Sequence, residues 1–77
     1  MDESSASIAY MRFGLTGREA EVLQAVARGY SNAEIGAELG IRPGTVKKHL
    51  ERVYDKLGVK TRLAAAVKVT ATRYRNN

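Results

Sequence analysis

Signals that start and stop helices recur along most of this 77-residue chain, and they restrict it to short helices joined by tight turns. Thr16 followed by Glu19 has the pattern of a capping box, and Ser31 followed by Glu34 repeats it. The only proline, Pro43, suits the first position of a helix. No segment shows the apolar–polar alternation of a β-strand. We therefore predict an all-α fold.

Apolar spacing between these signals predicts four helices, over residues 17–28, 32–39, 43–57 and 62–73. Glycines follow the first three helices, where a left-handed residue commonly ends a helix. The third helix has the clearest apolar stripe, formed by Val46, Leu50, Val53, Tyr54 and Leu57.

The four helices predict one domain with short ends. We expect a flexible arm or linker over residues 1–14, the domain over residues 15–74 and a frayed end over residues 75–77. A single domain of this size buries a small core and leaves little room for a catalytic pocket.

Charge is divided unevenly along the chain. The 13 Lys and Arg residues exceed the 8 Asp and Glu residues, which gives a net charge of +5. Residues 1–41 carry three basic and six acidic groups, a net of −3, whereas residues 42–77 carry ten basic and two acidic groups, a net of +8. A basic half indicates an anionic partner; nucleic acid is the first interpretation, a membrane surface the second, and a merely solvated helix face the third.

Composition argues against most enzyme and metal sites. The chain has no Cys and a single His, His49, and it pairs no nucleophile with a base and contains no glycine-rich phosphate loop. We predict a binding protein that is not an enzyme and needs no metal or cofactor. No apolar run approaches the roughly 20 residues of a membrane-spanning helix, and the chain starts with acidic and polar residues, so we expect a cytoplasmic protein.

The connection between the second and third predicted helices is the most informative segment. Residues 39–42, L-G-I-R, have the length and the glycine of a helix-turn-helix, in which two helices cross at roughly 90–120°. Ile41 is expected to pack beneath the turn. The helix over residues 43–57 would then be the recognition helix, which enters the DNA major groove.

Four motifs, in register, resemble LuxR-type DNA-binding domains. LTGREAEVL (15–23) resembles L-T-x-R-E-x-E-V-L, GYSNAEIG (29–36) resembles G-x-S-N-x-E-I-A, LGIRPGTVKKH (39–49) resembles L-G-I-S-x-x-T-V-K-x-H, and KLGVKTR (56–62) resembles K-L-G-V-x-S/N-R. The resemblance extends without gaps from residue 15 to about residue 70. It implies a four-helix domain that binds double-stranded promoter DNA, usually as a homodimer through the fourth helix. Such domains belong to response regulators, quorum-sensing regulators or autonomous regulators, for which RNA polymerase is a further candidate partner.

The resemblance also implies which residues contact DNA. Lys47, Lys48 and Glu51 occupy base-reading positions, and Thr45 and His49 fall where the family commonly touches the sugar-phosphate backbone. The full set of candidate DNA-binding residues is Arg42, Thr45, Lys47, Lys48, His49, Glu51, Arg52 and Lys60.

Several of these residues have a second interpretation. Lys47 and Lys48 can be merely solvated lysines, and Arg52 and Lys60 can be plain surface charges. Glu51 either accepts from a cytosine or only pairs with Lys47, four residues earlier. His49 either meets the DNA backbone or packs beside Val53. Arg42 replaces the usual Ser or Thr cap, which costs about 1 kcal/mol, and leaves an arginine that can reach a phosphate.

The fourth predicted helix is apolar on two faces, and only one of them can meet so small a core. The first stripe contains Leu63, Val67, Thr70 and Tyr74, and the second contains Ala65, Val69 and Thr72. We expect the other face to meet a second copy of the chain, with tight packing inside one domain as the alternative. The candidate interface residues are Leu63, Val67, Val69 and Thr70.

Two further protein classes compete with this interpretation. Region four of a sigma factor contains a similar helix-turn-helix, but residues 56–62 followed by a fourth helix favour the LuxR type. An interaction module that had lost DNA binding should show reversed charge on the third helix, whereas Lys47, Lys48 and Arg52 are basic. Arg62 contacts a phosphate or ties the fourth helix to the core, and we favour the second role.

Overall fold

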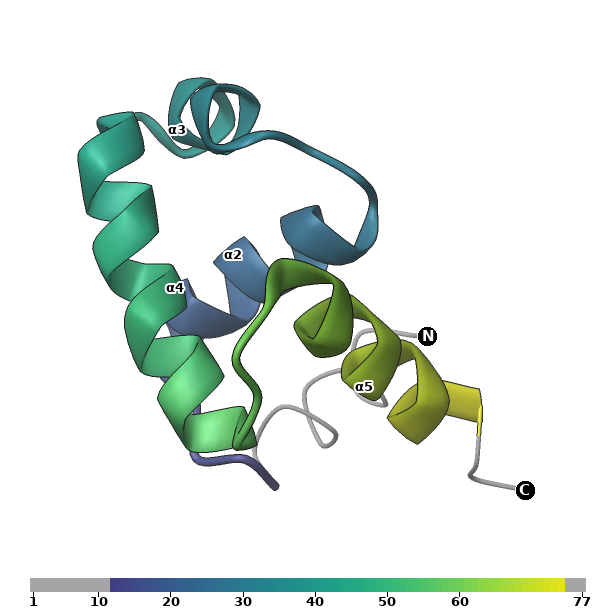
Figure 1. Cartoon of the computed structure of the whole chain (residues 1–77). Helices are drawn as coiled ribbons and strands as arrows, with labels where there is room; N and C mark the ends of the chain where they lie inside the picture. The colour runs from purple at the N-terminus through teal and green to yellow at the C-terminus, as the bar shows by residue number, and fades with distance from the viewer. Residues whose placement is uncertain (1–11, 75–77) are drawn as a thin grey trace.

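The computed structural model describes residues 12–74, which form four helices packed together (Figure 1). The helices are α2 (Gly17–Ala27), α3 (Asn32–Leu39), α4 (Pro43–Leu57) and α5 (Arg62–Tyr74). The described part of the chain contains no strand. The all-α prediction is confirmed, and every predicted helix end lies within one residue of the observed one.

Both predicted capping boxes form at the starts of α2 and α3. Thr16 Oγ1 accepts from the Glu19 amide at 3.1 Å, and Glu19 Oε1 accepts from the Thr16 amide at 3.0 Å. Ser31 Oγ accepts from the Glu34 amide at 3.1 Å, and Glu34 Oε1 accepts from the Ser31 amide at 2.8 Å. Each box satisfies two amides at its helix start, so local sequence determines where these two helices begin.

The start of α4 differs from those of α2 and α3. Arg42 is the N-cap residue and makes no side-chain capping bond, and Pro43 occupies the first turn. The helix ends at Leu57, and Gly58, with a φ of 73°, is its C-cap residue. The first turn of α4 therefore keeps amides that no capping side chain satisfies, as Arg42 at the cap position predicts.

The core consists of two apolar clusters that α4 joins. The first contains Leu23, Val53, Leu57, Ala65 and Val69. The second contains Val22, Ala25, Val26, Ile35, Val46 and Leu50. Tyr54 is half-buried and packs against both clusters. The predicted stripe of α4 thus faces α2 and α5 at one end and α2 and α3 at the other.

The turn between α3 and α4 lies directly against α3. A Cβ atom on Gly36 would come within 2.5 Å of the carbonyl oxygen of Ile41. The Ile41 amide donates to the Gly36 carbonyl at 2.9 Å, and the Ile41 side chain packs against the second cluster, as predicted. Close backbone contact at Gly36 therefore sets how α4 leaves the turn.

The structure answers which face of α5 is buried, and it corrects one interface residue. Ala65 and Val69 are fully buried, whereas the exposed fractions of Leu63 and Val67 are 73% and 56%. The assignment of Val69 to a dimer interface is therefore wrong, because its side chain fills the core. Thr70, like Leu63 and Val67, is exposed.

Part of the predicted arm contacts the domain. Phe13 packs against the first cluster, and the Gly14 carbonyl accepts a hydrogen bond from Lys56 at 3.0 Å. The predicted flexibility of residues 1–11 and the predicted fraying of residues 75–77 lie outside the described residues.

Replacing Gly36 by Ala should destabilise the domain by about 1–3 kcal/mol, because the new methyl group overlaps a backbone carbonyl. Gly44→Ala is the matched control, since a Cβ there meets no atom within 4 Å and alanine favours a helix. Urea denaturation of both variants measures the difference. Equal stability of the two variants would contradict the close contact at Gly36.

Candidate nucleic-acid interface

The outer face of α4 presents most of the residues predicted to contact DNA. This face lies opposite the buried stripe of the helix, so one side is held by the core and the other is open to a partner. The exposed residues here are Arg42, just before the helix, and Thr45, Lys47, Lys48, Glu51 and Arg52 on it.

Three cations at the N-terminal end of this surface form no ion pair with any residue that the structure describes. The ion pairs among the described residues are Arg18–Glu21, Arg28–Glu38 and Lys56–Glu19. Arg42, Lys47 and Lys48 take part in none of them. Their charges are therefore available to an anionic partner.

Glu51 lies on the same exposed face and forms none of these ion pairs. The alternative in which Glu51 only pairs with Lys47 thus has no supporting contact in the free domain. An exposed carboxylate without a partner can accept from a base amino group.

His49 is half-buried at the flank of α4. Its Nδ1 atom is buried and has no hydrogen-bond partner. The ring therefore both packs against the domain, as one interpretation predicts, and keeps an edge at the surface.

Lys60 is separated from the other candidates. It is exposed in the connection between α4 and α5, after the helix end at Leu57. About 13.5 Å of helix lies between Lys48 and that end. The structure therefore gathers the remaining candidates around α4 and leaves Lys60 beyond its C-terminal end.

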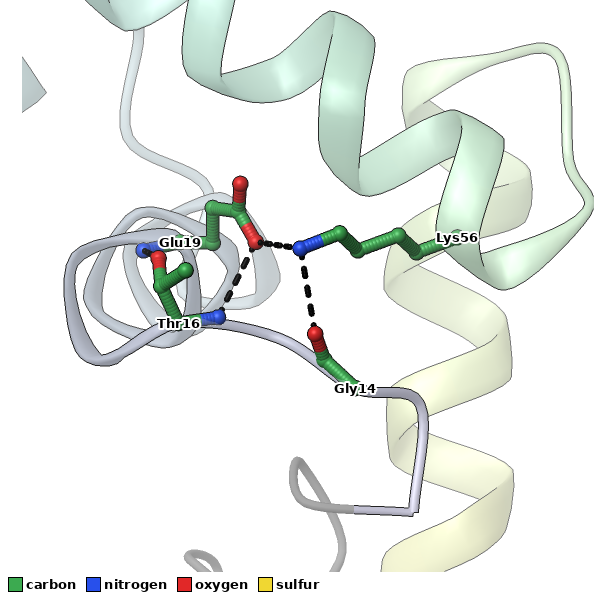
Figure 2. A network of polar contacts seen from close by, with 4 residues as sticks. All are labelled: Gly14, Thr16, Glu19 and Lys56. Atoms are coloured by element: carbon green, nitrogen blue, oxygen red, sulfur yellow. Dashed lines mark hydrogen bonds and ion pairs between the residues drawn. The ribbon is translucent and has the colours of Figure 1, made fainter.

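A partly buried ion pair holds the C-terminal end of α4 to the start of α2 (Figure 2). Lys56 Nζ lies 2.7 Å from Glu19 Oε1 and donates to the Gly14 carbonyl at 3.0 Å. The Glu19 side chain is only 4% exposed, and the same Oε1 completes the capping box with Thr16. One carboxylate oxygen thus caps α2 and fixes the position of α4.

The surroundings of Glu19 lower the pKa of its carboxyl group. Burial by itself raises the pKa of a carboxyl group. Here hydrogen bonds from Lys56 and the Thr16 amide, together with the charges of Lys56 and Arg52, outweigh burial and lower the pKa of Glu19 below its usual value of 4.5. The ionised form is therefore the one that the fold stabilises.

This pair was missed in the sequence, although Glu19 and Lys56 both stand in recognised motifs. The two residues are 37 positions apart, and no local spacing connects them. The capping box already accounted for Glu19, so no local pattern indicated its second contact, with Lys56.

Arg62 has the structural role that the sequence favoured. Its Nη1 donates to Asn32 Oδ1 at 2.8 Å, and its Nη2 donates to the Tyr30 carbonyl. The guanidinium therefore ties the start of α5 to the start of α3 and supports the helix-turn-helix from behind.

Other kinds of site find no support in the described part of the chain. Its side chains include no group of three or more His, Asp or Glu that could hold a metal ion. None of its helices is long and apolar enough to cross a membrane.

A comparison with known families decides the classification. The family model described as "Bacterial regulatory proteins, luxR family" matches residues 14–69. The chain belongs to the luxR family. Its helix-turn-helix is thus that of a DNA-binding domain of transcription regulators, as the four motifs predicted.

Curated relatives agree with this membership. The chain is 50% identical over 60 residues to the "Probable transcriptional regulatory protein SgaR" of Hyphomicrobium methylovorum, and 48% identical over 59 residues to the "Probable transcriptional regulatory protein NarL" of Mycobacterium tuberculosis. These matches cover 77% of this chain but only 28% and 27% of the relatives. The "Transcriptional regulatory protein DesR" of Bacillus subtilis is 47% identical over 51 residues, which are 66% of this chain and 26% of that protein. No solved structure matches the chain significantly.

Glu19→Gln should lower the free energy of unfolding at neutral pH by about 1–2 kcal/mol, because it removes the charged partner of Lys56. Since the pKa of Glu19 is lowered in the folded state, its contribution is complete above about pH 4.5 and is lost as the pH falls through the folded pKa. The stability difference between wild type and variant, measured by denaturation at several pH values, should shrink in that range.

Glu21→Gln provides the control for this measurement, because Glu21 is exposed and pairs only with Arg18 on the surface. A Glu21 variant as unstable as the Glu19 variant would contradict a special role for the Lys56–Glu19 pair.

Proposed function

We propose that this domain binds promoter DNA by inserting α4 into the major groove. The observation that carries the proposal is a group of exposed cations that pair with no carboxylate among residues 12–74. Arg42 lies just before α4, and Lys47 and Lys48 lie on the helix, whose other side is buried. An α-helix fits the width of the major groove, and base edges there differ in their pattern of donors and acceptors. Membership of the luxR family supports the same partner.

The candidate residues then divide into two roles. Lys47, Lys48 and Glu51 read base edges, where lysine suits guanine and a carboxylate suits cytosine. Arg42, Thr45, His49 and Arg52 contact the sugar-phosphate backbone and position the helix. Lys60, beyond the C-terminal end of α4, adds positive potential and at most a backbone contact.

We further propose that two copies bind together through the exposed face of α5. Leu63 and Val67 are the large apolar side chains that the described surface exposes, and Thr70 lies beside them. A two-fold contact uses the same patch on both copies. One helix face buries less than the roughly 1,000 Å² of a stable interface, so the free domain is largely monomeric and pairs on an inverted repeat.

The regulator in which this domain works is also a proposal. The names of the relatives describe transcriptional regulators, and the chain spans about a quarter of their length. The domain therefore serves as the effector part of such a regulator or acts as a small regulator by itself. RNA polymerase is a candidate partner at the promoter, and the cytoplasm is the compartment in which a bacterial promoter is reached.

Lys47→Ala and Lys48→Ala should each weaken binding to a DNA site selected from a random library by about 1–3 kcal/mol more than binding to random DNA. The reason is that a base contact acts only on the matching sequence, whereas a phosphate contact acts on all sequences. Fluorescence anisotropy with both duplexes measures the two affinities.

Lys60→Ala is the control, because this lysine is equally exposed but lies away from the N-terminal half of α4. It should affect both duplexes alike and only slightly. If the Lys47 and Lys48 variants lost equal affinity for both duplexes, these lysines would contact the DNA backbone rather than the bases.

Val67→Glu and Val69→Glu should separate the two faces of α5. Val67 is 56% exposed, so its glutamate variant should fold but bind an inverted repeat with lower cooperativity. Val69 is fully buried, so a charge there should unfold the domain. Circular dichroism and gel-shift titration measure the two effects, and unchanged cooperativity of the folded Val67 variant would refute pairing through this face.

A further inference from the structure

The two ring nitrogens of His49, the only histidine in the chain, have different surroundings. Nδ1 is buried and is the buried side-chain polar atom without a hydrogen-bond partner in the described part of the chain. Nε2 is not buried in this way and forms no hydrogen bond with the residues that the structure describes. The ring thus has a dry inner edge and an outer edge that a partner can reach.

This asymmetry determines where a neutral ring carries its proton. A neutral imidazole has one N–H and one acceptor nitrogen. A proton on Nδ1 would bury a donor without an acceptor, and orphaned buried N–H groups are rarer in proteins than under-satisfied acceptors. A proton on Nε2 instead leaves the N–H at the surface. The neutral ring is therefore the Nε2–H tautomer.

The position of His49 on α4 indicates what this N–H meets. His49 follows Thr45 by four residues and precedes Arg52 by three, so the three side chains share one flank of the helix. Thr45 and Arg52 are exposed. A flank beside the base-reading face borders the phosphates of one DNA strand when the helix lies in the groove.

A cationic ring would bury the same Nδ1–H without an acceptor. We therefore propose that His49 donates to a DNA phosphate as the neutral Nε2–H tautomer. The inference rests on the proposed function, and it defines the kind of contact that His49 makes. A neutral donor positions the helix on any sequence and replaces no counterion, unlike the lysines beside it. The buried Nδ1 edge keeps the ring oriented for this contact.

The tautomer can be measured without DNA. Long-range proton–nitrogen correlation spectra of the ¹⁵N-labelled 77-residue protein, at slightly alkaline pH, distinguish a protonated ring nitrogen from an unprotonated one. We expect the unprotonated signal at Nδ1 and the protonated signal at Nε2. A proton on Nδ1 would overturn the inference.

The contact itself is tested with variants and a random-sequence DNA duplex, because a phosphate contact does not depend on sequence. His49→Gln keeps a donor near the position of Nε2, whereas His49→Asn places its amide near Nδ1 and His49→Leu has no donor. We expect His49→Gln to bind within about twofold of wild type and the other two to bind about fivefold to tenfold more weakly.

The leucine variant separates a loss of DNA affinity from a folding defect. It fills the dry edge with apolar atoms, so thermal unfolding should show it at least as stable as wild type, even where the asparagine variant unfolds. The proposed contact would be overturned if His49→Gln lost as much affinity as His49→Leu. It would also be overturned if the folded leucine variant bound DNA as tightly as wild type.

Salt dependence distinguishes a neutral donor from a cation. His49→Leu should leave the slope of log K against log[salt] unchanged, whereas Lys48→Ala should reduce its magnitude by about one. A reduction of about one in His49→Leu would show that His49 binds as a cation and would overturn the neutral contact. Wild-type binding without salt dependence would instead refute the proposed DNA-binding surface, while the tautomer measurement would still stand.

Discussion

The burial of one side of α4 is the interaction on which the rest of the structure depends. Its stripe of Val46, Leu50, Val53 and Leu57 takes part in both apolar clusters, so α4 packs against each of the other three helices. Because this side is fully engaged, the opposite side is left as a continuous polar surface. The same packing that gives a small domain its core therefore also presents its basic helix face.

Polar contacts around the core then orient this helix. Lys56 attaches its C-terminal end to Glu19 and Gly14, Gly36 brings its N-terminal turn against α3, and Arg62 braces α3 from α5. The charged groups of Lys56 and Arg62 are therefore used in contacts within the domain. Cations at the N-terminal end of α4 form no ion pair in the described part of the chain, so only some of the positive charge of the basic half is used by the fold.

Much of the fold could be predicted because its signals are local. A capping box needs residues three apart, and a helix stripe needs residues three and four apart, so the helix ends and the buried side of α4 followed from short segments. The face of α4 that carries Lys47 and Lys48 was predictable for the same reason. Contacts between distant segments, such as that of Glu19 with Lys56, have no such periodicity and could not be found.

The sequence by itself determined the four helices, the turn between α3 and α4, and the family to which the chain belongs. Tertiary structure decided which face of α5 is buried, because both of its stripes are apolar enough for a core and only packing against the other helices selects Ala65 and Val69. It likewise decided that one edge of His49 is dry, since burial of Nδ1 depends on the packed domain rather than on any neighbour in sequence.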